Sequence, residues 1–328
     1  MDPVCHTLVG GALAESGLKR RTALGAATLL VAANAPDVDV LAYLAGPTTA
    51  LWLRRGVTHG IVAWFVLPIL ITGIVLGVDR LLGRSRDRER AVPSQVLLLA
   101  LVGVATHPVL DLLNTYGVRL LMPFSDRWFY GDALFIVDPW IWVLLTLGIV
   151  WSRRNARVAN RGTAAVHGSG HRALAHPARW ALLLLAVYIG VMTGSNLAAR
   201  RMVVSALAEQ GLPSPERLMV APLPLDPLRR RVVVEIDGAY LGGTFSWLGK
   251  PRVELNDLGL RREPDFRTVA AIRGPEVRHF LSWARFPYFE VAPGGSGGAV
   301  LVGDARYTLR PQGSWASVRV QMGASPDP

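Results

Sequence analysis

Residues 96–117 read VLLLALVGVATHPVLDLLNTYG, an apolar run that ends in polar side chains. His107, Asp111 and Asn114 recur at i, i+4 and i+7, so on a helix they project from one face. An ionisable side chain at membrane depth costs roughly 2.5–3.5 kcal/mol even on insertion scales. A coordinated metal ion would offset that cost, because it turns buried charges into bound ligands. The stretch therefore predicts a membrane helix whose polar end contributes to a metal site.

The composition favours a membrane protein. The chain has 328 residues, of which 51% are hydrophobic, and a mean hydropathy of +0.32. Its net charge is +11, but much of the basic charge lies in short loops between apolar runs, which membrane topology explains better than nucleic-acid binding. We therefore predict no nucleic-acid partner. The single Cys5 excludes an intramolecular disulfide and a cysteine-based zinc cage, and residues 1–17 lack the features of a cleavable signal peptide.

Several apolar runs are long enough, or nearly so, to cross a bilayer of about 30 Å. They are residues 60–82, 96–113, 134–151 and 180–197. Two shorter runs, 4–14 and 22–35, precede them and fit inside a bundle. We therefore predict an α-helical polytopic membrane bundle of about five or six helices, followed by a β-rich soluble domain.

The distribution of basic residues predicts the orientation. Three basic connections, 19–21, 83–90 and 153–179, fall on one side of the membrane if the chain crosses it six times. The positive-inside rule assigns that side to the cytoplasm. We therefore expect a multi-pass protein of the bacterial inner membrane, in contact with the lipid bilayer. The metal site and everything after Leu197 would lie outside the cytoplasm.

Four parts follow from this pattern: a membrane-embedded metal-site domain (1–152), a flexible cytoplasmic loop (153–179), the last transmembrane helix (180–199) and a β-rich extracytoplasmic domain (200–328). The loop contains His167, His171 and His176, which we interpret as solvated rather than metal-binding. In the last part, short β-branched stretches alternate with turn residues such as Asp237-Gly238, a hairpin signal. The segment APGGSGG at 292–298 is interpreted as a loop.

The polar residues of the membrane half lie at the predicted outer ends of its helices, although they are scattered over more than 100 positions of the chain. Imidazole and carboxylate are ligands that zinc accepts, and Mn²⁺ or Fe²⁺ also binds such mixed sets. Three histidines and two or three aspartates suit a dinuclear site better than one closed tetrahedral site. The predicted metal ligands are His6, Asp37, Asp39, His59, His107 and Asp111.

Each of these residues also has an interpretation without a metal. His6 or His59 alone could be hydrogen-bonded at a helix end, and Asp37 could be a turn residue. Asp39 is either a second ligand or a partner that orients a histidine. His107 and Asp111 could form a buried hydrogen-bonded pair.

Five further polar residues of the membrane half are candidates: three aspartates, one asparagine and one arginine. Arg55 either holds a substrate phosphate or marks the membrane interface. Asn114 and Asp138 are either ligands or supporting residues, Asp138 as a helix cap. Asp126 and Asp132 are interpreted as loop residues.

Several segments carry a resemblance: MDPVCHTLVGGALAE at the start, then NAPDVDVL, RRGVTHG and THPVLDLLNTYG. Over residues 1–150 their order and spacing resemble the bacterial membrane-bound, metal-dependent hydrolases of the YdjM type. This resemblance implies a metal and hydrolysis but no particular substrate.

A more distant similarity is to zinc-dependent phospholipase C and related single-strand nucleases, which use a His, an Asp, a His and an H-x-x-x-D pair in that order. The matching residues here are His6, Asp37 or Asp39, His59, His107 and Asp111. Those enzymes also use a downstream H-x-x-x-E and their amino-terminal residue as ligands. This chain has no H-x-x-x-E, and its first residue lies five positions before His6, so we expect one or two ions rather than three.

Together these observations predict a membrane-bound metal-dependent hydrolase. Its substrate would be a phosphodiester or ester, including lipid-derived ones, attacked by a metal-activated water. The predicted catalytic residues are Asp39 or Asp111 as base, with Arg55. The alternatives are a metal-ion-handling or transport protein, and a scaffold with a structural metal and a partner-binding β domain. The sequence does not identify the metal, the substrate or the oligomeric state.

Overall fold

The computed structural model describes residues 1–82, 89–162, 177–264, 274–292, 299–307 and 315–321. The chain forms two compact units. The first, here called the helical unit, comprises residues 1–39 and 55–193. The second, here called the β-rich unit, comprises residues 40–54 and 194–328. The segment 40–54 therefore belongs to the second unit although it lies within the sequence of the first.

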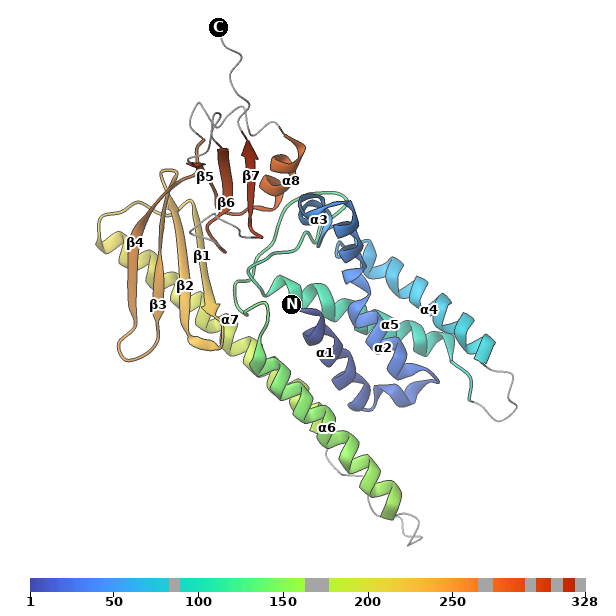
Figure 1. Cartoon of the computed structure of the whole chain (residues 1–328). Coiled ribbons are helices and arrows are strands. Elements are labelled where there is room, and N and C mark those ends of the chain that lie inside the picture. Colours follow the sequence, from blue (N-terminus) through green and yellow to red (C-terminus); the bar gives the residue numbers. More distant parts are fainter. Residues whose placement is uncertain (83–88, 163–176, 265–273, 293–298, 308–314, 322–328) are drawn as a thin grey trace. The chain divides into compact units, whose positions relative to one another are not determined.

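The helical unit is built from short and long helices (Figure 1). Some of them pack on the next helix in the sequence, and others pack on helices that are distant in the sequence. They are α1 (Pro3–Glu15), α2 (Gly25–Asn34), α4 (Ala63–Leu82), α5 (Pro93–Leu112), α6 (Pro139–Gly162) and the first half of α7 (Pro177–Glu209). Two 3₁₀ segments, η1 (Leu18–Arg21) and η2 (Ala35–Ala45), follow α1 and α2. Helix α2 contacts both α1 and α5, α4 packs on α5, and α1 packs on α6.

Small residues set the close approach of the three central helices. A Cβ atom at Gly103 of α5 would lie 2.6 Å from the Cβ of Ala32 in α2. A Cβ at Gly10 of α1 would lie 2.9 Å from the carbonyl oxygen of Leu29. Glycine and alanine at such interfaces are typical of packed membrane helices. This packing places the first turn of α1 next to the last turn of α5.

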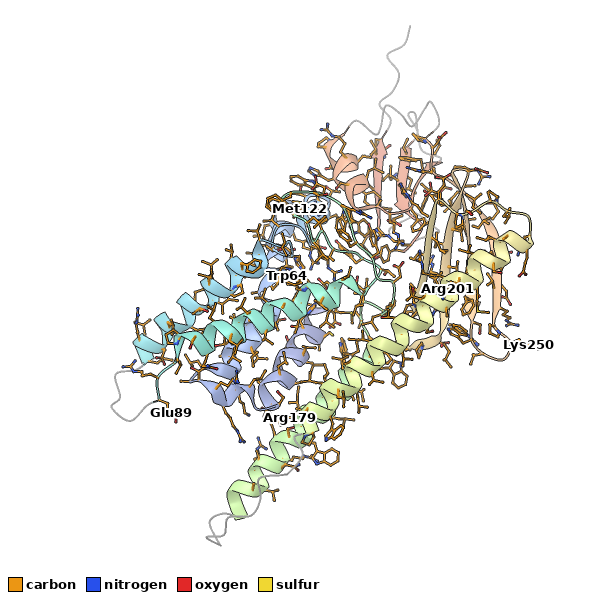
Figure 2. The ribbon with its side chains drawn as sticks, turned by 180° about the vertical axis from the view of Figure 1, so that it is seen from behind. Trp64, Glu89, Met122, Arg179, Arg201 and Lys250 are labelled. Carbon is orange, nitrogen blue, oxygen red and sulfur yellow. The ribbon has the colours of Figure 1, made fainter. Side chains whose placement is uncertain are left out.

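Within the described residues, four helical segments are long and apolar enough to cross a membrane: 25–45, 63–82, 93–112 and 177–209. Helix α4, which carries Trp64 at its start (Figure 2), exposes large apolar side chains such as Phe65, Ile69 and Ile74. The predicted polytopic helical fold is therefore confirmed. Helix α6 is not among these segments, because its second half is basic.

Three predicted boundaries change. The prediction of a flexible loop from residue 153 is wrong for residues 153–162, which continue α6. This stretch contains good helix formers and no proline, and its only glycine is the last residue of the helix. The predicted fifth span began at residue 134, whereas α6 begins at Pro139. Helix α7 begins at Pro177 and continues to Glu209, so the predicted boundary at residue 200 falls inside a helix.

Parts of other predicted loops lie outside the described residues. These are most of the basic connection 83–90, the segment that contains His167, His171 and His176, and residues 293–298 of the APGGSGG loop.

The β-rich unit contains two antiparallel sheets. The first has the order β1 (Arg217–Leu223), β2 (Asp226–Ile236), β3 (Ala239–Ser246) and β4 (Arg252–Arg261), and the second joins β5 (Pro287–Ala292), β6 (Ala299–Asp304) and β7 (Ser317–Gln321). The hairpin predicted at Asp237-Gly238 is confirmed, because both residues have positive φ between β2 and β3. The second half of α7 packs on the first sheet through Val203 and Leu207. Helix α3 (Pro47–Leu53) packs on α8 (Pro275–Trp283).

Candidate metal centre

Five of the predicted ligands come together at one end of the helical unit. His6 lies in the first turns of α1, and Asp37 lies in η2 directly after α2. His59 precedes α4, while His107 and Asp111 occupy the last turns of α5. We call these five residues the metal centre. Their convergence was predicted from their positions at the outer ends of helices, and the structure brings them together.

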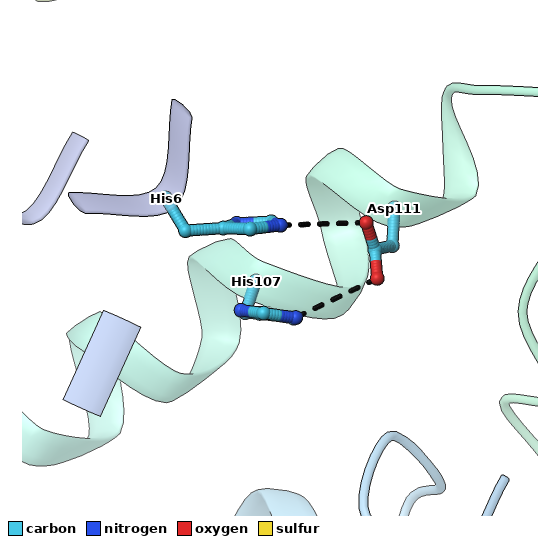
Figure 3. A group of neighbouring side chains, drawn as sticks. All are labelled: His6, His107 and Asp111. Carbon is cyan, nitrogen blue, oxygen red and sulfur yellow. Dashed lines mark ion pairs between the residues drawn. The ribbon is translucent and has the colours of Figure 1, made fainter. Parts of the chain in front are cut away.

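The carboxylate of Asp111 lies at the middle of the metal centre, facing three imidazole rings. Its Oδ1 is 3.4 Å from Nε2 of His6, and its Oδ2 is 3.2 Å from Nε2 of His59 and 3.5 Å from Nε2 of His107. Figure 3 shows His6 and His107 on the same side of this carboxylate. The side chains of all four residues are buried.

The imidazole rings also face one another. Nε2 of His59 and Nε2 of His107 are 3.2 Å apart, and the His6 and His107 rings stack with centroids 3.6 Å apart. Asp37 closes the group, with its Oδ1 3.8 Å from Nε2 of His107. Two triplets result, His6–His107–Asp111 and Asp37–His59–His107, each with ligand atoms within 4.8 Å of one another.

Contacts on the outer side of two rings direct their Nε2 atoms inward. Nδ1 of His107 is 2.7 Å from the carbonyl oxygen of Ala33, which can only accept a hydrogen bond, so this ring nitrogen carries the proton. Nδ1 of His59 is 3.0 Å from the Thr58 hydroxyl and 3.4 Å from Oδ2 of Asp39. Carboxylates and carbonyls in this position orient the ring and make Nε2 the free ligand atom.

Asp39 therefore differs in position from the other predicted ligands. Its Oδ2 accepts hydrogen bonds from the backbone N–H of Arg55 at 2.7 Å and from the Thr58 hydroxyl at 3.2 Å. It lies at the Nδ1 side of His59, opposite the nitrogen that faces the centre. Of the two roles left open by the sequence, this position matches the residue that orients a histidine.

Arg55 is buried beside the metal centre. Its Nη2 is 3.0 Å from Oδ1 of Asp111, and its Nη1 donates to Oδ1 of Asn114 at 3.0 Å and to the carbonyl of Gly117 at 3.3 Å. The α-amino group of Met1 also contacts Oδ1 of Asp111. Arg55 has a positive φ of 51°, a conformation that costs a non-glycine residue energy and often marks a functional site. The guanidinium thus places a fixed positive charge next to the ligand carboxylate.

The loop after α5 carries a second arginine. The backbone N–H of Arg119 donates to the carbonyl of Arg55 at 2.9 Å, and its guanidinium lies over the Trp128 ring, 4.9 Å from the centroid. Burial lowers the pKa of Arg119 from its ordinary value, although the charge of Asp126 opposes this shift. The backbone of Arg119 thus contacts Arg55, whereas its guanidinium lies against Trp128 and Asp126.

Asn114 and Asp138 stabilise the structure around the metal centre and do not face its middle. Oδ1 of Asn114 accepts hydrogen bonds from Arg55 and from the backbone N–H of Tyr116 at 2.8 Å. Asp138 caps α6, since its Oδ1 accepts from the N–H groups of Trp140 and Ile141, and its Oδ2 accepts from the Tyr188 hydroxyl. Both residues therefore match the supporting role that the sequence left open.

Asp126 and Asp132 lie in the loop between α5 and α6, as predicted, and Asp126 pairs with Arg119 at 3.5 Å. Sequence reasoning missed Thr58 and the carbonyl of Ala33. Thr58 could have been noticed as the hydroxyl adjacent to His59, whereas a backbone carbonyl leaves no signal in a sequence.

The donor set fits a divalent ion. Ligand atoms about 2.0–2.2 Å from a tetrahedral zinc ion lie about 3.3–3.6 Å from one another. The contacts around Asp111 span 3.2–3.5 Å. Without a metal, one proton shared between Nε2 of His59 and Nε2 of His107 would give these two atoms a hydrogen bond, but it would leave the other buried groups without one. Both ring nitrogens of His6 and Oδ2 of Asp111 are buried without a hydrogen-bond partner among the described residues. A cation between Nε2 of His6, the other Nε2 atoms and the Asp111 carboxylate would compensate these ligand atoms at once.

Comparison with known proteins places this arrangement in a family. Residues 1–199 match the YdjM inner membrane protein family. The chain belongs to this family. The match contains the whole metal centre and ends within α7, so the two β-sheets lie outside it. Membership of the YdjM family, together with the apolar helices, places the protein in the membrane against the lipid bilayer.

A curated relative also matches part of the chain. The "Uncharacterized protein YfhP" of Bacillus subtilis (strain 168) is 27% identical over 114 residues, which is 35% of this chain and 32% of that protein. The chain therefore matches about a third of that relative's length. No solved structure matches the chain. The similarity to zinc-dependent phospholipase C thus rests on the order of the motifs alone.

Proposed function

We propose that the protein is a membrane-bound, metal-dependent hydrolase that acts on a phosphodiester or ester, including lipid-derived substrates. The observation that supports this most strongly is the convergence of three imidazole Nε2 atoms on the Asp111 carboxylate, at 3.2–3.5 Å. A site of this kind is costly to bury unless it serves a bound ion.

In this proposal, His6, His59, His107, Asp37 and Asp111 hold one or two divalent ions, with zinc the expected metal. A bound ion supplies Lewis acidity and lowers the pKa of a coordinated water. Asp39 and the Ala33 carbonyl keep two of the rings in the tautomer that presents Nε2. Of the two predicted bases, Asp111 faces the centre and Asp39 does not, so Asp111 is the better placed proton acceptor.

The cationic surroundings favour an anionic group in the substrate. Nη2 of Arg55 is 3.0 Å from Oδ1 of Asp111. Fixed positive charges beside a hydrolytic centre stabilise the charge that develops on a phosphoryl group. This supports a phosphodiester over a neutral ester.

The orientation is part of the proposal. The basic segment 19–21 follows α1, and the basic second half of α6 contains Arg153, which pairs with Glu15 at the end of α1 away from His6. The positive-inside rule assigns such basic ends to the cytoplasm. The metal centre and the β-rich unit would then face the outside of the cell, where lipid headgroups of the outer leaflet are accessible.

The test is hydrolysis by the purified full chain in detergent or nanodiscs, loaded with Zn²⁺, Mn²⁺ or Fe²⁺. A chromogenic phosphodiester and a set of phospholipids serve as substrates. We expect metal-dependent hydrolysis that a chelator abolishes and that His107→Ala reduces at least about 100-fold, as for loss of a metal-binding group. Asp257→Asn, an exposed change in β4 of the β-rich unit, is the control and retains the wild-type rate.

Two outcomes overturn the proposal. Equal rates for wild type and His107→Ala would remove the metal centre from the reaction. Metal uptake into sealed vesicles without hydrolysis of any phosphoester would instead support a metal-transporting protein.

A further inference from the structure

The buried guanidinium of Arg55 bears on how many ions the metal centre holds. Its Nη1 donates to Oδ1 of Asn114 at 3.0 Å and to the carbonyl of Gly117 at 3.3 Å. Its Nη2 donates to the carbonyl of Met1 at 3.2 Å and lies 3.0 Å from Oδ1 of Asp111. Each terminal nitrogen of an arginine carries two N–H groups, so each of these groups has an acceptor.

The loop after α5 holds this guanidinium in one position. The guanidinium carbon lies 4.6 Å from the centroid of the Tyr116 ring. The backbone N–H of Tyr116 also donates to Oδ1 of Asn114, the atom that accepts from Arg55. Arg55 is only 4% exposed. Its positive charge is therefore fixed beside Asp111 and does not move to follow a ligand.

The two oxygens of the Asp111 carboxylate have different neighbours. Oδ2 lies 3.2 Å from Nε2 of His59 and 3.5 Å from Nε2 of His107. Oδ1 lies 3.4 Å from Nε2 of His6, as Figure 3 shows, and it is also the oxygen that Arg55 contacts. A second cation on Oδ1 would have to displace the guanidinium or lie beside its charge. Like charges repel strongly where water is excluded.

The position of His107 also limits the number of ions. His107 belongs to both ligand triplets of the metal centre. Its Nδ1 donates to the carbonyl of Ala33 at 2.7 Å, so only Nε2 is available as a ligand atom. One imidazole nitrogen has one lone pair and binds one ion. The two triplets therefore cannot be filled at the same time by two ions that both bind His107.

We propose that the metal centre binds a single divalent ion and that the guanidinium of Arg55 takes the place of a second one. This proposal rests on the metal centre of the proposed function and deepens it. The ligand types alone suited two ions, but they do not reveal that Arg55 lies against Oδ1 of Asp111. In two-metal hydrolases both ions stabilise charge on the reacting group. Here one ion and one fixed guanidinium share the carboxylate, and the guanidinium cannot dissociate.

The experiment measures the zinc bound by the purified full chain after saturation with Zn²⁺ and removal of unbound ions by gel filtration. We expect about one equivalent on wild type and on Arg55→Lys, which keeps the positive charge. Arg55→Gln removes that charge and leaves Oδ1 of Asp111 and Nε2 of His6 to bind a second ion, so its zinc content should rise to about two equivalents.

Arg119→Gln is the matched control. It removes the charge of another buried arginine of the helical unit, whose guanidinium contacts Trp128 and Asp126 rather than the metal centre. Its zinc content should equal that of wild type. The rise on Arg55→Gln is then caused by the contact with Asp111 and not by the loss of a positive charge in general.

A second measurement needs no variant and decides the number of ions even if Arg55→Gln does not fold. Mn²⁺ bound to wild type should give the electron paramagnetic resonance spectrum of an isolated ion at every ratio of metal to protein. Two manganese ions that share one carboxylate would instead give the narrower hyperfine spacing of a coupled pair. A coupled spectrum, or two equivalents of zinc on wild type, would overturn the proposal. So would a single equivalent on folded Arg55→Gln.

These results are separate from the test of hydrolysis. One ion on a protein that hydrolyses no phosphoester would contradict the proposed function and leave the single-ion centre in place. Two ions on an active hydrolase would do the reverse. A wild type that binds no metal would contradict both.

Discussion

Asp111 in the helical unit and Asp304 in the β-rich unit are both 0% exposed, but their surroundings are opposite. Oδ2 of Asp304 accepts hydrogen bonds from the backbone N–H of Arg285 at 2.7 Å and from Nε and Nη2 of Arg306 at 3.0 and 2.8 Å. Its Oδ1 accepts from the N–H of Arg306 at 2.9 Å. Donors thus occupy both oxygens of this carboxylate.

Asp111 instead faces the acceptor-capable nitrogens of three imidazoles. Its Oδ2 makes no hydrogen bond among the described residues, although two Nε2 atoms lie within 3.5 Å of it. Arg55 and the Met1 α-amino group contact Oδ1 only. A buried carboxylate whose oxygens both accept hydrogen bonds has a structural role, whereas one that also faces three imidazoles is suited to binding a cation.

The first prediction concerns Asp304 and Arg306, the buried ion pair of the β-rich unit. Asp304→Ala leaves the Arg306 guanidinium buried without its partner, which should cost about 3–5 kcal/mol in the free energy of unfolding of the β-rich unit. Hydrogen exchange in β5, β6 and β7 measures this loss. Metal content should not change, and a parallel loss of metal would contradict the distinction between the two aspartates.

The second prediction concerns the unsatisfied carboxylate. Asp111→Asn keeps the size of the side chain but removes the charge that faces the three rings. Zn²⁺ affinity should fall at least about 100-fold, measured by competition with a chromophoric chelator. Asp257→Asn, in β4 of the β-rich unit, is the control and should bind Zn²⁺ as wild type does. Unchanged Zn²⁺ affinity in Asp111→Asn would show that Asp111 has a structural role, like Asp304.

The third prediction separates ligands from orienting residues. Asp39→Asn should weaken Zn²⁺ binding by about 10–100-fold, because the His59 ring loses the carboxylate behind its Nδ1. The decrease should be smaller than for Asp111→Asn. If the two variants lose the same affinity, Asp39 binds the metal directly.

The last and smallest effect is expected at the helix cap. Asp138→Ala removes the acceptor for the first N–H groups of α6 and should cost about 1 kcal/mol. Thermal unfolding followed by circular dichroism measures this cost. Zn²⁺ affinity should stay at the wild-type value, and a loss of metal would show that Asp138 belongs to the centre.

Much of this arrangement could be predicted from the sequence, because membrane helices leave a strong pattern. Apolar runs locate the helices. Polar residues at the ends of these runs are easy to recognise, because a membrane-spanning segment otherwise needs apolar side chains. His6, His59 and His107 could therefore be assigned to one level of the bundle from the sequence alone. The hairpin at Asp237-Gly238 was equally evident, since few sequences adopt two consecutive positive φ angles.

Other features depend on tertiary structure and left no local signal. The role of Asp39 depends on which side of the His59 ring it reaches, and sequence spacing does not determine that. The ends of α6 and α7 were misplaced because hydropathy reports where the membrane ends rather than where a helix ends. The assignment of residues 40–54 to the β-rich unit depends on the packing of α3 against α8, between segments more than 200 positions apart.

The most direct test of the central claim is the metal content of the purified protein, measured by elemental analysis of wild type and His107→Ala after gel filtration. His107 belongs to both ligand triplets, so its loss affects one or two ions alike. We expect one or two equivalents of a divalent metal, with zinc the expected ion, on wild type and less than about a tenth of that on the variant. Equal metal content in the two proteins, or none in a wild type exposed to excess Zn²⁺, would contradict it.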